Sequence, residues 1–478
     1  MSELARHDAV GLAELIRAGR LSPLELMDDT IERIERLNPL VNAVIHPALD
    51  EARATAANGT LADGPFHGVP MLIKDLWPGE KGKPLHKGVR ALKAAGHRAD
   101  ADANIVTAYR RAGFVLAGRT NTPELGLAAT TEPAAYGPTC NPWDLERGPG
   151  GSSGGAAAAV AAGMLPAANA SDGGGSIRIP AALCGLVGLK PSRGRVSMGP
   201  DQDEWGNSVQ HVVCHTMRDC AAILDATAYP FPGDGVVAPA PPTPFRECVE
   251  ADPPPLRIGI LDRSIRDGIP IDPEVAGAVR AAADLLERLG HQMLDEAPPA
   301  LADQDLIASY GALATANVAA TLVTFGGRLG RELTPDDVEP ATWLLAERGR
   351  RLGAVDTAIA AGQAMRFRHR MAAWWAERAD LLLAPTCLRP APLLGESAGT
   401  EENPFANVHV TLAYSTLTAP FNTTGQPAMS LPLARTESGL PIGVQLIAAY
   451  GREDLLLQIG GQLERAVAWA SERAPIHP

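Results

Sequence analysis

The chain has 478 residues, of which 20% are charged, and a net charge of −13 at pH 7. This acidic balance excludes the basic surface of a typical nucleic-acid-binding protein, and no run of about 18 apolar residues predicts a membrane span. The start of the chain lacks the apolar core of a secretory signal and the six cysteines show no paired spacing, so we expect free thiols, a cytoplasmic location, and neither nucleic acid nor membrane as a partner.

Two helices are predicted at the start of the chain. Residues 12–16, with the sequence LAELI, predict one short helix. Ser22 and Glu25 then have the spacing of a capping box, in which each side chain satisfies a backbone N–H of the first helical turn. The helix that follows places four apolar residues on one face: Met27, Ile31, Ile34 and Leu37.

An apolar run, residues 71–73, leads into Lys74 and predicts a strand. A lysine at the end of a strand most often reaches solvent. Burial among apolar residues would instead lower its pKa from about 10.4 towards neutrality, and a neutral lysine can act as a general base. The loop of residues 78–84 that follows is polar, and we interpret its lysines as solvated.

Two serines that are 24 residues apart each lie in a glycine-rich loop. Ser152 belongs to the sequence GGSSGG, before an alanine-rich stretch, residues 156–165, that predicts a buried helix. Ser176 follows three glycines and precedes a helix with Pro180 in its first turn. Three unobstructed N–H groups can converge on one oxygen, which predicts an oxyanion hole. Its donors would be Gly173, Gly174 and Gly175.

Each of these elements alone is weak evidence for catalysis. A lone glycine-rich loop is most often flexible, and the first loop is not a phosphate loop because Gly155 runs into alanines instead of a Gly-Lys-Ser/Thr ending. A serine nucleophile needs a base, and no histidine lies near Ser176 in the sequence. A histidine that is distant in the sequence but close in space remains an alternative base. Lys74, Ser152 and Ser176 together predict a Ser-Ser-Lys hydrolase site.

Residues 150–197 resemble the signature segment of the amidase signature family, and blocks flanking this segment also resemble family blocks. The flanking blocks are residues 111–124, 141–143, 420–432 and 439–445. The resemblance implies an α/β fold with a central mixed β-sheet covered by helices on both faces. It also implies hydrolysis of an amide through an acyl-enzyme. We expect no metal and no cofactor, because the sequence shows no HExxH or paired-cysteine motif and no Gly-Lys-Ser/Thr ending after the glycines.

The resemblance also assigns roles at the site. Ser176 matches the nucleophile and Lys74 the terminal base. Ser152 matches the bridging serine, which in this family follows a cis peptide, here with Gly151. Three further residues support the site, Ser153 as a neighbour and the other two as an ion pair that braces the loop: Ser153, Asp172 and Arg178.

The rest of the chain predicts alternating strands and helices. Residues 230–255 are rich in proline, which indicates a surface excursion. Apolar strands at 256–261 and 381–385 flank a helix at 273–289, as expected of an α/β protein. The length would allow about three domains. Because matching motifs run from residue 74 to residue 445, we expect one catalytic domain over residues 1–478.

The substrate is predicted to be a small carboxamide. Residues 130–133 and 448–458 resemble the branch of the family that hydrolyses cyclic amides of 6-aminohexanoate. One departure from the family stands out, because Gly173 and Gly174 replace the more usual Thr-Gly or Ala-Ala pair. The oligomeric state stays open, with a homodimer among the options.

Two alternatives remain. The chain resembles the glutaminase subunit of the tRNA-dependent amidotransferase in the signature segment, but residues 358–366 do not resemble that subunit's tyrosine-rich glutamine-binding segment. A binding protein without activity on the same fold is disfavoured because Lys74, Ser152 and Ser176 are all present.

Overall fold

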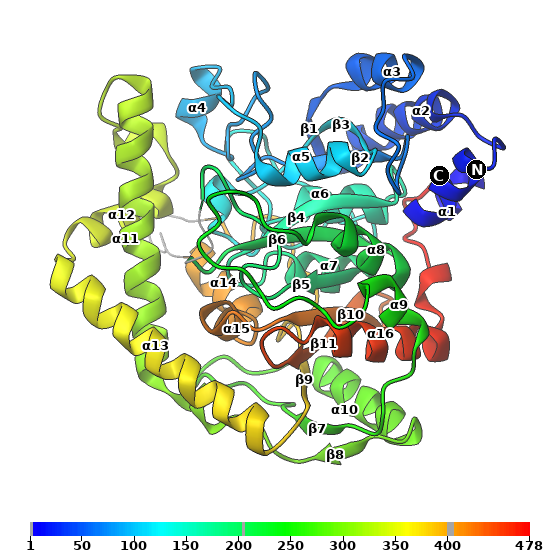
Figure 1. The fold of residues 1–478 in the computed structure, drawn as a ribbon. Coiled ribbons are helices and arrows are strands. Elements are labelled where there is room, and N and C mark those ends of the chain that lie inside the picture. Colours follow the sequence, from blue (N-terminus) through cyan, green and yellow to red (C-terminus); the bar gives the residue numbers. More distant parts are fainter. Residues whose placement is uncertain (1–2, 203–205, 399–405) are drawn as a thin grey trace.

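In the computed structural model, which describes residues 3–202, 206–398 and 406–478, eleven strands form one mixed sheet (Figure 1). The order across the sheet is β1-β3-β2-β4-β6-β5-β10-β11-β9-β7-β8. The strands are β1 (Val44–Pro47), β2 (Pro70–Lys74), β3 (Val115–Thr120), β4 (Ala167–Asp172), β5 (Val187–Lys190), β6 (Val209–Cys214), β7 (Arg257–Ile260), β8 (Gln292–Leu294), β9 (Leu381–Pro385), β10 (Ala428–Arg435) and β11 (Pro441–Ala448).

The register of β2 and β4 positions the predicted site. The two strands are parallel neighbours, with Leu72 opposite Ala168. Because parallel strands end at the same edge of a sheet, Lys74 at the end of β2 and Asp172 at the end of β4 emerge on the same side. Strand β6 pairs antiparallel with both β4 and β5, and β10 pairs antiparallel with β5. The sheet is therefore mixed, as expected.

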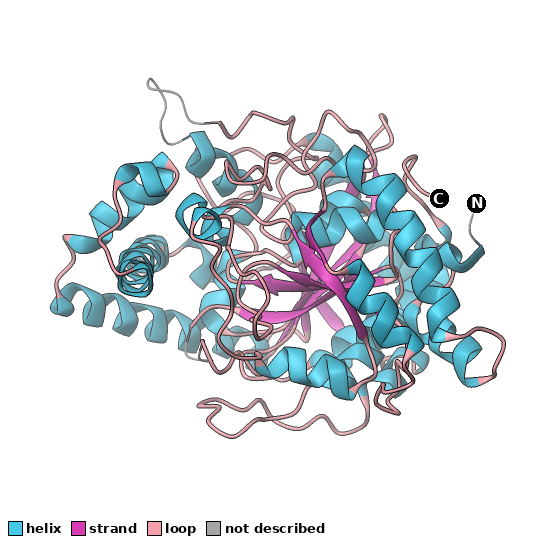
Figure 2. Cartoon of the chain, turned by 90° about the horizontal axis from the view of Figure 1, so that it is seen from above, coloured by secondary structure: helices cyan, strands magenta, loops and turns pink. Residues whose placement is uncertain are grey.

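Helices pack on both faces of the sheet, as Figure 2 shows. The α-helices of the described ranges, including those that lie beside the sheet, are α1 (Ala9–Arg17), α2 (Pro23–Val41), α3 (Leu49–Ala57), α4 (Arg90–Ala94), α5 (Asn104–Arg111), α6 (Gly154–Ala161), α7 (Arg178–Cys184), α8 (Met217–Thr227), α9 (Phe245–Glu250), α10 (Pro273–Arg288), α11 (Gln304–Leu329), α12 (Pro340–Arg350), α13 (Ala354–Glu377), α14 (Ala406–Ser415), α15 (Ala419–Thr424) and α16 (Glu453–Val467). No helix in the described ranges combines the length and apolar character needed to cross a bilayer.

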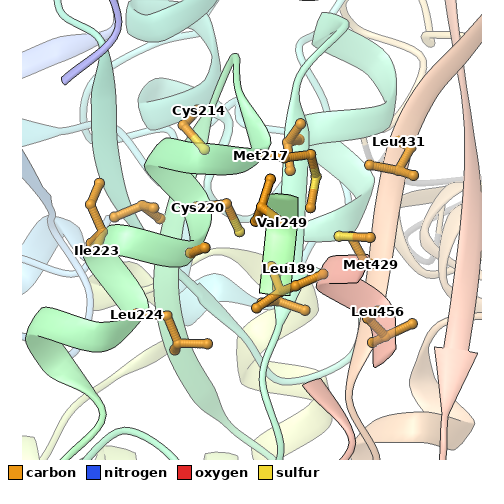
Figure 3. Close-up of a cluster of buried hydrophobic side chains, with 14 of the residues drawn as sticks. Leu189, Cys214, Met217, Cys220, Ile223, Leu224, Val249, Met429, Leu431 and Leu456 are labelled. Carbon is orange, nitrogen blue, oxygen red and sulfur yellow. The ribbon is translucent and has the colours of Figure 1, made fainter. Parts of the chain in front are cut away.

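The core lies in two layers because side chains alternate across each strand. In β2, Met71 and Ile73 belong to one buried cluster and Leu72 to another. Figure 3 shows part of the first cluster, where Leu189 and Met429 of the sheet lie near Leu456 of α16. The predicted α/β fold with a central mixed sheet is therefore confirmed, whereas a single domain over residues 1–478 stays a prediction.

Several local predictions are confirmed. The capping box is present at the start of α2, where the Glu25 N–H donates to Ser22 Oγ at 3.2 Å. Pro180 is the third residue of α7. Strand β9 has the predicted bounds, and α10 ends one residue earlier than predicted.

Two predictions were wrong in their extent. Helix α6 ends at Ala161, before the predicted end at residue 165, because Gly163 adopts a left-handed conformation with φ of 71°. The proline-rich stretch of residues 230–255 is not only a surface excursion. It contains α9, in which Phe245 and Cys248 are buried.

Candidate active site

Lys74 is one of the fully buried residues of the predicted site. It ends the fully buried strand β2, and none of its own surface is exposed. Its Nζ lies 2.7 Å from Ser152 Oγ, 2.8 Å from Ser153 Oγ and 3.0 Å from Ser171 Oγ. The lysine is thus buried as predicted, and three hydroxyl groups surround its amine, two from the Ser152–Ser153 loop and one from β4.

The environment of Lys74 favours a neutral amine. Burial lowers its pKa well below the ordinary value, and the negative charge of Asp172 only partly opposes this shift. The oxygens that contact Nζ belong to hydroxyl groups and to the backbone carbonyl of Ser171, at 3.4 Å. Neutral oxygens do not compensate the charge of an ammonium as a carboxylate contact would.

The loop that carries Ser152 fits tightly between other backbone segments. The peptide between Gly151 and Ser152 is cis, as the family resemblance implied. A Cβ at position 151 would lie 2.6 Å from the carbonyl oxygen of Thr130 and 2.7 Å from that of Ala128. Only glycine fits at this approach. Ser153 joins the loop to β4 because its hydroxyl donates to the Ser171 carbonyl at 3.2 Å.

Ser176 lies beside these residues but is more accessible. Its side chain is partly exposed, whereas Lys74 and Ser152 are buried. The Ser153 N–H donates to the Ser176 carbonyl at 3.3 Å, which joins the two serine loops. In the described part of the chain, no hydrogen bond connects the hydroxyl groups of Ser152 and Ser176. Lys74 and Ser152 are therefore already joined by a hydrogen bond in the buried part of the site, whereas Ser176 lies in its exposed part.

The glycine loop before Ser176 offers a different set of donors from the one predicted. The Gly175 N–H donates to Asp172 Oδ1 at 2.7 Å, so it is not available to a substrate in this structure. The N–H groups of Gly173, Gly174 and Ser176 have no acceptor within the described ranges. These three donors remain for an oxyanion.

The predicted ion pair between Asp172 and Arg178 is present and fully buried. The Arg178 Nε and Nη2 donate to the two Asp172 carboxylate oxygens, each at 3.0 Å. Burial alone would raise the pKa of Asp172, but the Arg178 guanidinium holds it below its usual value. Arg178 also donates to Asn422 Oδ1 at 2.7 Å and to Gln445 Oε1 at 3.2 Å. This network fixes the start of the Ser176 loop.

The family model for Amidase matches residues 25–457. This chain belongs to the amidase signature family. It is 42% identical over 475 residues to the 6-aminohexanoate-cyclic-dimer hydrolase of Paenarthrobacter ureafaciens, and the match covers 98% of this chain and 96% of that protein. It is also 34% identical over 491 residues to the A-type subunit of the glutamyl-tRNA(Gln) amidotransferase of Synechococcus sp. (strain CC9311), with 96% of each chain covered.

A solved structure of a 6-aminohexanoate cyclic dimer hydrolase superimposes on this amidase with a TM-score of 0.94, at 41% identity and with 99% of each chain covered. The predicted family and the predicted branch within it are both confirmed. The protein is a hydrolase of carbon–nitrogen bonds in amides.

Sequence reasoning missed four residues that contact the site of this amidase. Ser171 contacts Lys74, Tyr310 and Thr418 donate to the glycine loop, and Asn422 contacts Asp172. Ser171 could have been found from the sequence, because it lies directly before Asp172, at the end of β4. Asn422 lay in a block that resembles the family, but nothing local to Tyr310 or Thr418 pointed to the site.

Within the described ranges, no three His, Cys, Asp or Glu side chains gather in a way that could hold a metal ion. Action without a metal or cofactor stays a prediction.

Proposed function

We propose that this amidase hydrolyses small carboxamides, cyclic or linear amides of the 6-aminohexanoate type, through an acyl-enzyme on Ser176. One observation carries the proposal: Lys74 Nζ, fully buried, lies 2.7 Å from Ser152 Oγ. The substrate class rests on the names of the relatives, a 6-aminohexanoate-cyclic-dimer hydrolase among them.

The contacts of Lys74 fit a neutral amine. Such an amine has two N–H donors and one lone pair. The donors suit Ser153 Oγ at 2.8 Å and Ser171 Oγ at 3.0 Å, and the lone pair can accept the Ser152 proton at 2.7 Å. Ser153 donates to the Ser171 carbonyl, so its own oxygen is left to accept from the amine. Lys74 is then the base and Ser152 the proton relay.

In the first half of the reaction, Ser176 Oγ attacks the carbonyl carbon of the amide. Its proton moves to Ser152 Oγ while the Ser152 proton moves to Lys74 Nζ. The carbonyl electron pair becomes an oxyanion, which the N–H groups of Gly173, Gly174 and Ser176 stabilise. The proton then returns through Ser152 to the leaving nitrogen and the C–N bond breaks. A linear amide releases its amine at this point, whereas the amine of a cyclic amide stays joined to the acyl group on Ser176.

In the second half, water takes the place of the Ser176 hydroxyl. It gives a proton to the same relay and attacks the ester carbon. The bond to Ser176 Oγ breaks, the relay returns a proton to that oxygen, and a carboxylic acid is released. Catalytic hydrogen bonds are often long in unliganded enzymes and shorten in the substrate complex, which fits the missing bond between the Ser152 and Ser176 hydroxyls.

The test is a substrate panel with the purified full chain: 6-aminohexanoate cyclic dimer, its linear dimer, an uncharged anilide, and glutamine. We expect hydrolysis of at least one non-glutamine amide, unchanged by a chelator, with added hydroxylamine diverting the acyl group to a hydroxamate. Activity on glutamine alone, and only with a partner protein, would replace this proposal by the amidotransferase function, which the 34% identical relative keeps open.

The same proposal includes one catalytic domain over residues 1–478, a cytoplasmic location, and action without nucleic acid or a membrane.

A further inference from the structure

Tyr310 reaches the glycine loop from outside the signature segment. It belongs to the long helix α11, and its hydroxyl donates to the Gly173 carbonyl at 3.1 Å. Burial raises the pKa of Tyr310 to about 12, so the hydroxyl keeps its proton across the working pH range. The Tyr310 hydroxyl can therefore donate to this carbonyl throughout that range.

The bonded carbonyl shares a peptide unit with a predicted oxyanion donor. In a planar trans peptide, the C=O of Gly173 and the N–H of Gly174 point in opposite directions. A hydroxyl that fixes the carbonyl therefore also fixes the direction of the N–H. Donation to the carbonyl also polarises the amide, which makes its N–H a stronger donor.

The next peptide of the loop is held in a similar way but is used differently. Thr418 Oγ1 donates to the Gly174 carbonyl at 2.6 Å. The N–H of that peptide, on Gly175, donates to Asp172 Oδ1 at 2.7 Å. Thus the peptide held by Thr418 is bonded at both ends within the protein. The peptide held by Tyr310 has its N–H left over for a substrate.

The unusual glycine pair fits the presence of this tyrosine. A Cβ at position 174 would lie 2.7 Å from the Tyr310 hydroxyl oxygen, but 3.8 Å from Tyr310 Cζ and 3.9 Å from Ala419 Cβ. Of these three atoms, the hydroxyl oxygen alone is too close to a Cβ for ordinary van der Waals contact. Gly174 does not adopt a left-handed conformation, so its backbone would accept alanine.

We propose that Tyr310 is a positioning residue that directs the Gly174 N–H towards the oxyanion, and that glycine is required at position 174 to admit its hydroxyl. The inference rests on the proposed function, because it assumes an oxyanion formed by attack of Ser176. Tyr310 acts through the loop and not on the reacting atoms.

The first test is Tyr310→Phe. We expect kcat to fall roughly tenfold to a hundredfold, less than the loss of a whole oxyanion donor, with KM within about twofold of the wild type. A boronic acid that forms a tetrahedral adduct on serine should lose affinity by the same factor as kcat. With the linear dimer as the substrate, the affinity for its product 6-aminohexanoate should not change. Tyr414→Phe is the matched control, because this buried tyrosine donates to the Pro390 carbonyl at 2.8 Å, away from the loop.

The second test is a double-mutant cycle with Gly174→Ala. In the wild-type background the new methyl group meets the Tyr310 hydroxyl, so we expect a large loss of kcat. In the Tyr310→Phe background the obstacle is gone, and Gly174→Ala should lower kcat by less than threefold. Strong non-additivity supports the inference.

Three outcomes overturn it: full kcat in Tyr310→Phe, a rise in KM alone, or additive effects in the cycle. Labelling of wild-type Ser176 by a fluorophosphonate keeps these outcomes separate from failure of the proposed function. If Ser176 is labelled but Tyr310→Phe is fully active, only the positioning role is wrong. If Ser176 is not labelled, the proposed function itself is wrong.

Discussion

At the scale of single residues, the amine of Lys74 determines how the protein should depend on pH. Its pKa in the folded protein is lowered by burial, and the neutral form that the proposed mechanism requires is populated above that pKa. We expect kcat/KM to rise with pH through the lowered pKa and to collapse in acid. The measurement is a pH profile with an uncharged anilide as the substrate. A flat profile from acid to neutral pH, with chemistry rate-limiting, would exclude lysine as the base.

The same burial makes Lys74 unfavourable for stability. The unfolded chain holds the proton up to a pH of about 10.4, so between the folded and unfolded pKa values stability increases with pH. Methionine has a similar length and no charge to desolvate. We therefore expect Lys74→Met to lower kcat by about a thousandfold while its melting temperature at pH 7 is not lower than that of the wild type. Calorimetry that found it several degrees less stable would contradict this account.

Some residues of the site could be predicted from the sequence and others could not. Lys74 follows a run of apolar residues, and Ser152 and Ser176 lie beside glycines. Such local patterns can be recognised from a single sequence. The contact of Tyr310 with Gly173 joins residues 137 positions apart. No local pattern records such a contact. The donation of the Gly175 N–H to Asp172 was missed for another reason, because glycines show that a loop can turn but not where each N–H points.

At the scale of elements, the loop between β4 and α7 depends on a buried ion pair. Asp172→Asn would leave the Arg178 guanidinium buried without a counter-charge, and we expect a loss of about 3–5 kcal/mol in the free energy of unfolding. Urea denaturation at pH 7 measures it. The surface pair of Asp28 and Arg53, at 2.7 Å, provides the control, because Asp28→Asn should cost less than about 1 kcal/mol. Equal effects of the two substitutions would refute a special role for the buried pair.

Element boundaries were predictable where a side chain sets them. The Ser22 and Glu25 side chains begin α2, and the apolar runs define β2 and β9. The end of α6 was missed because alanines continue the helical pattern to Gly163, whose backbone conformation ends it. Helix α11 has apolar residues on all sides, so no polar and apolar faces indicated how it packs or that it would reach the site.

At the scale of the whole molecule, the sheet topology brings distant segments to one place. Strands β2 and β4 are adjacent although almost a hundred residues separate them, and their parallel ends place Lys74 beside Ser171. Residues of β11 and α15 contact the site from the other side, since Gln445 and Asn422 both accept from Arg178. The order of strands in the sheet results from long-range packing, so the sequence predicted the class of fold but not this arrangement.

Helices α11, α12 and α13 lie beside the sheet layers at one side of the molecule (Figure 1). Through Tyr310, one of them contacts the glycine loop. A change in this helical region should therefore alter kcat without a direct contact to the reacting atoms. The Tyr310→Phe comparison of kcat and KM measures that coupling.

The central claim is that Ser176 is a nucleophile activated through Ser152 by neutral Lys74. The most direct measurement is labelling with a fluorophosphonate at pH 8, followed by intact mass and peptide mapping. We predict one equivalent of label, on Ser176, with labelling at least a hundredfold slower in Lys74→Met and absent in Ser176→Ala, which should also lack amidase activity. Label on another residue, together with an active Ser176→Ala variant, would contradict the account.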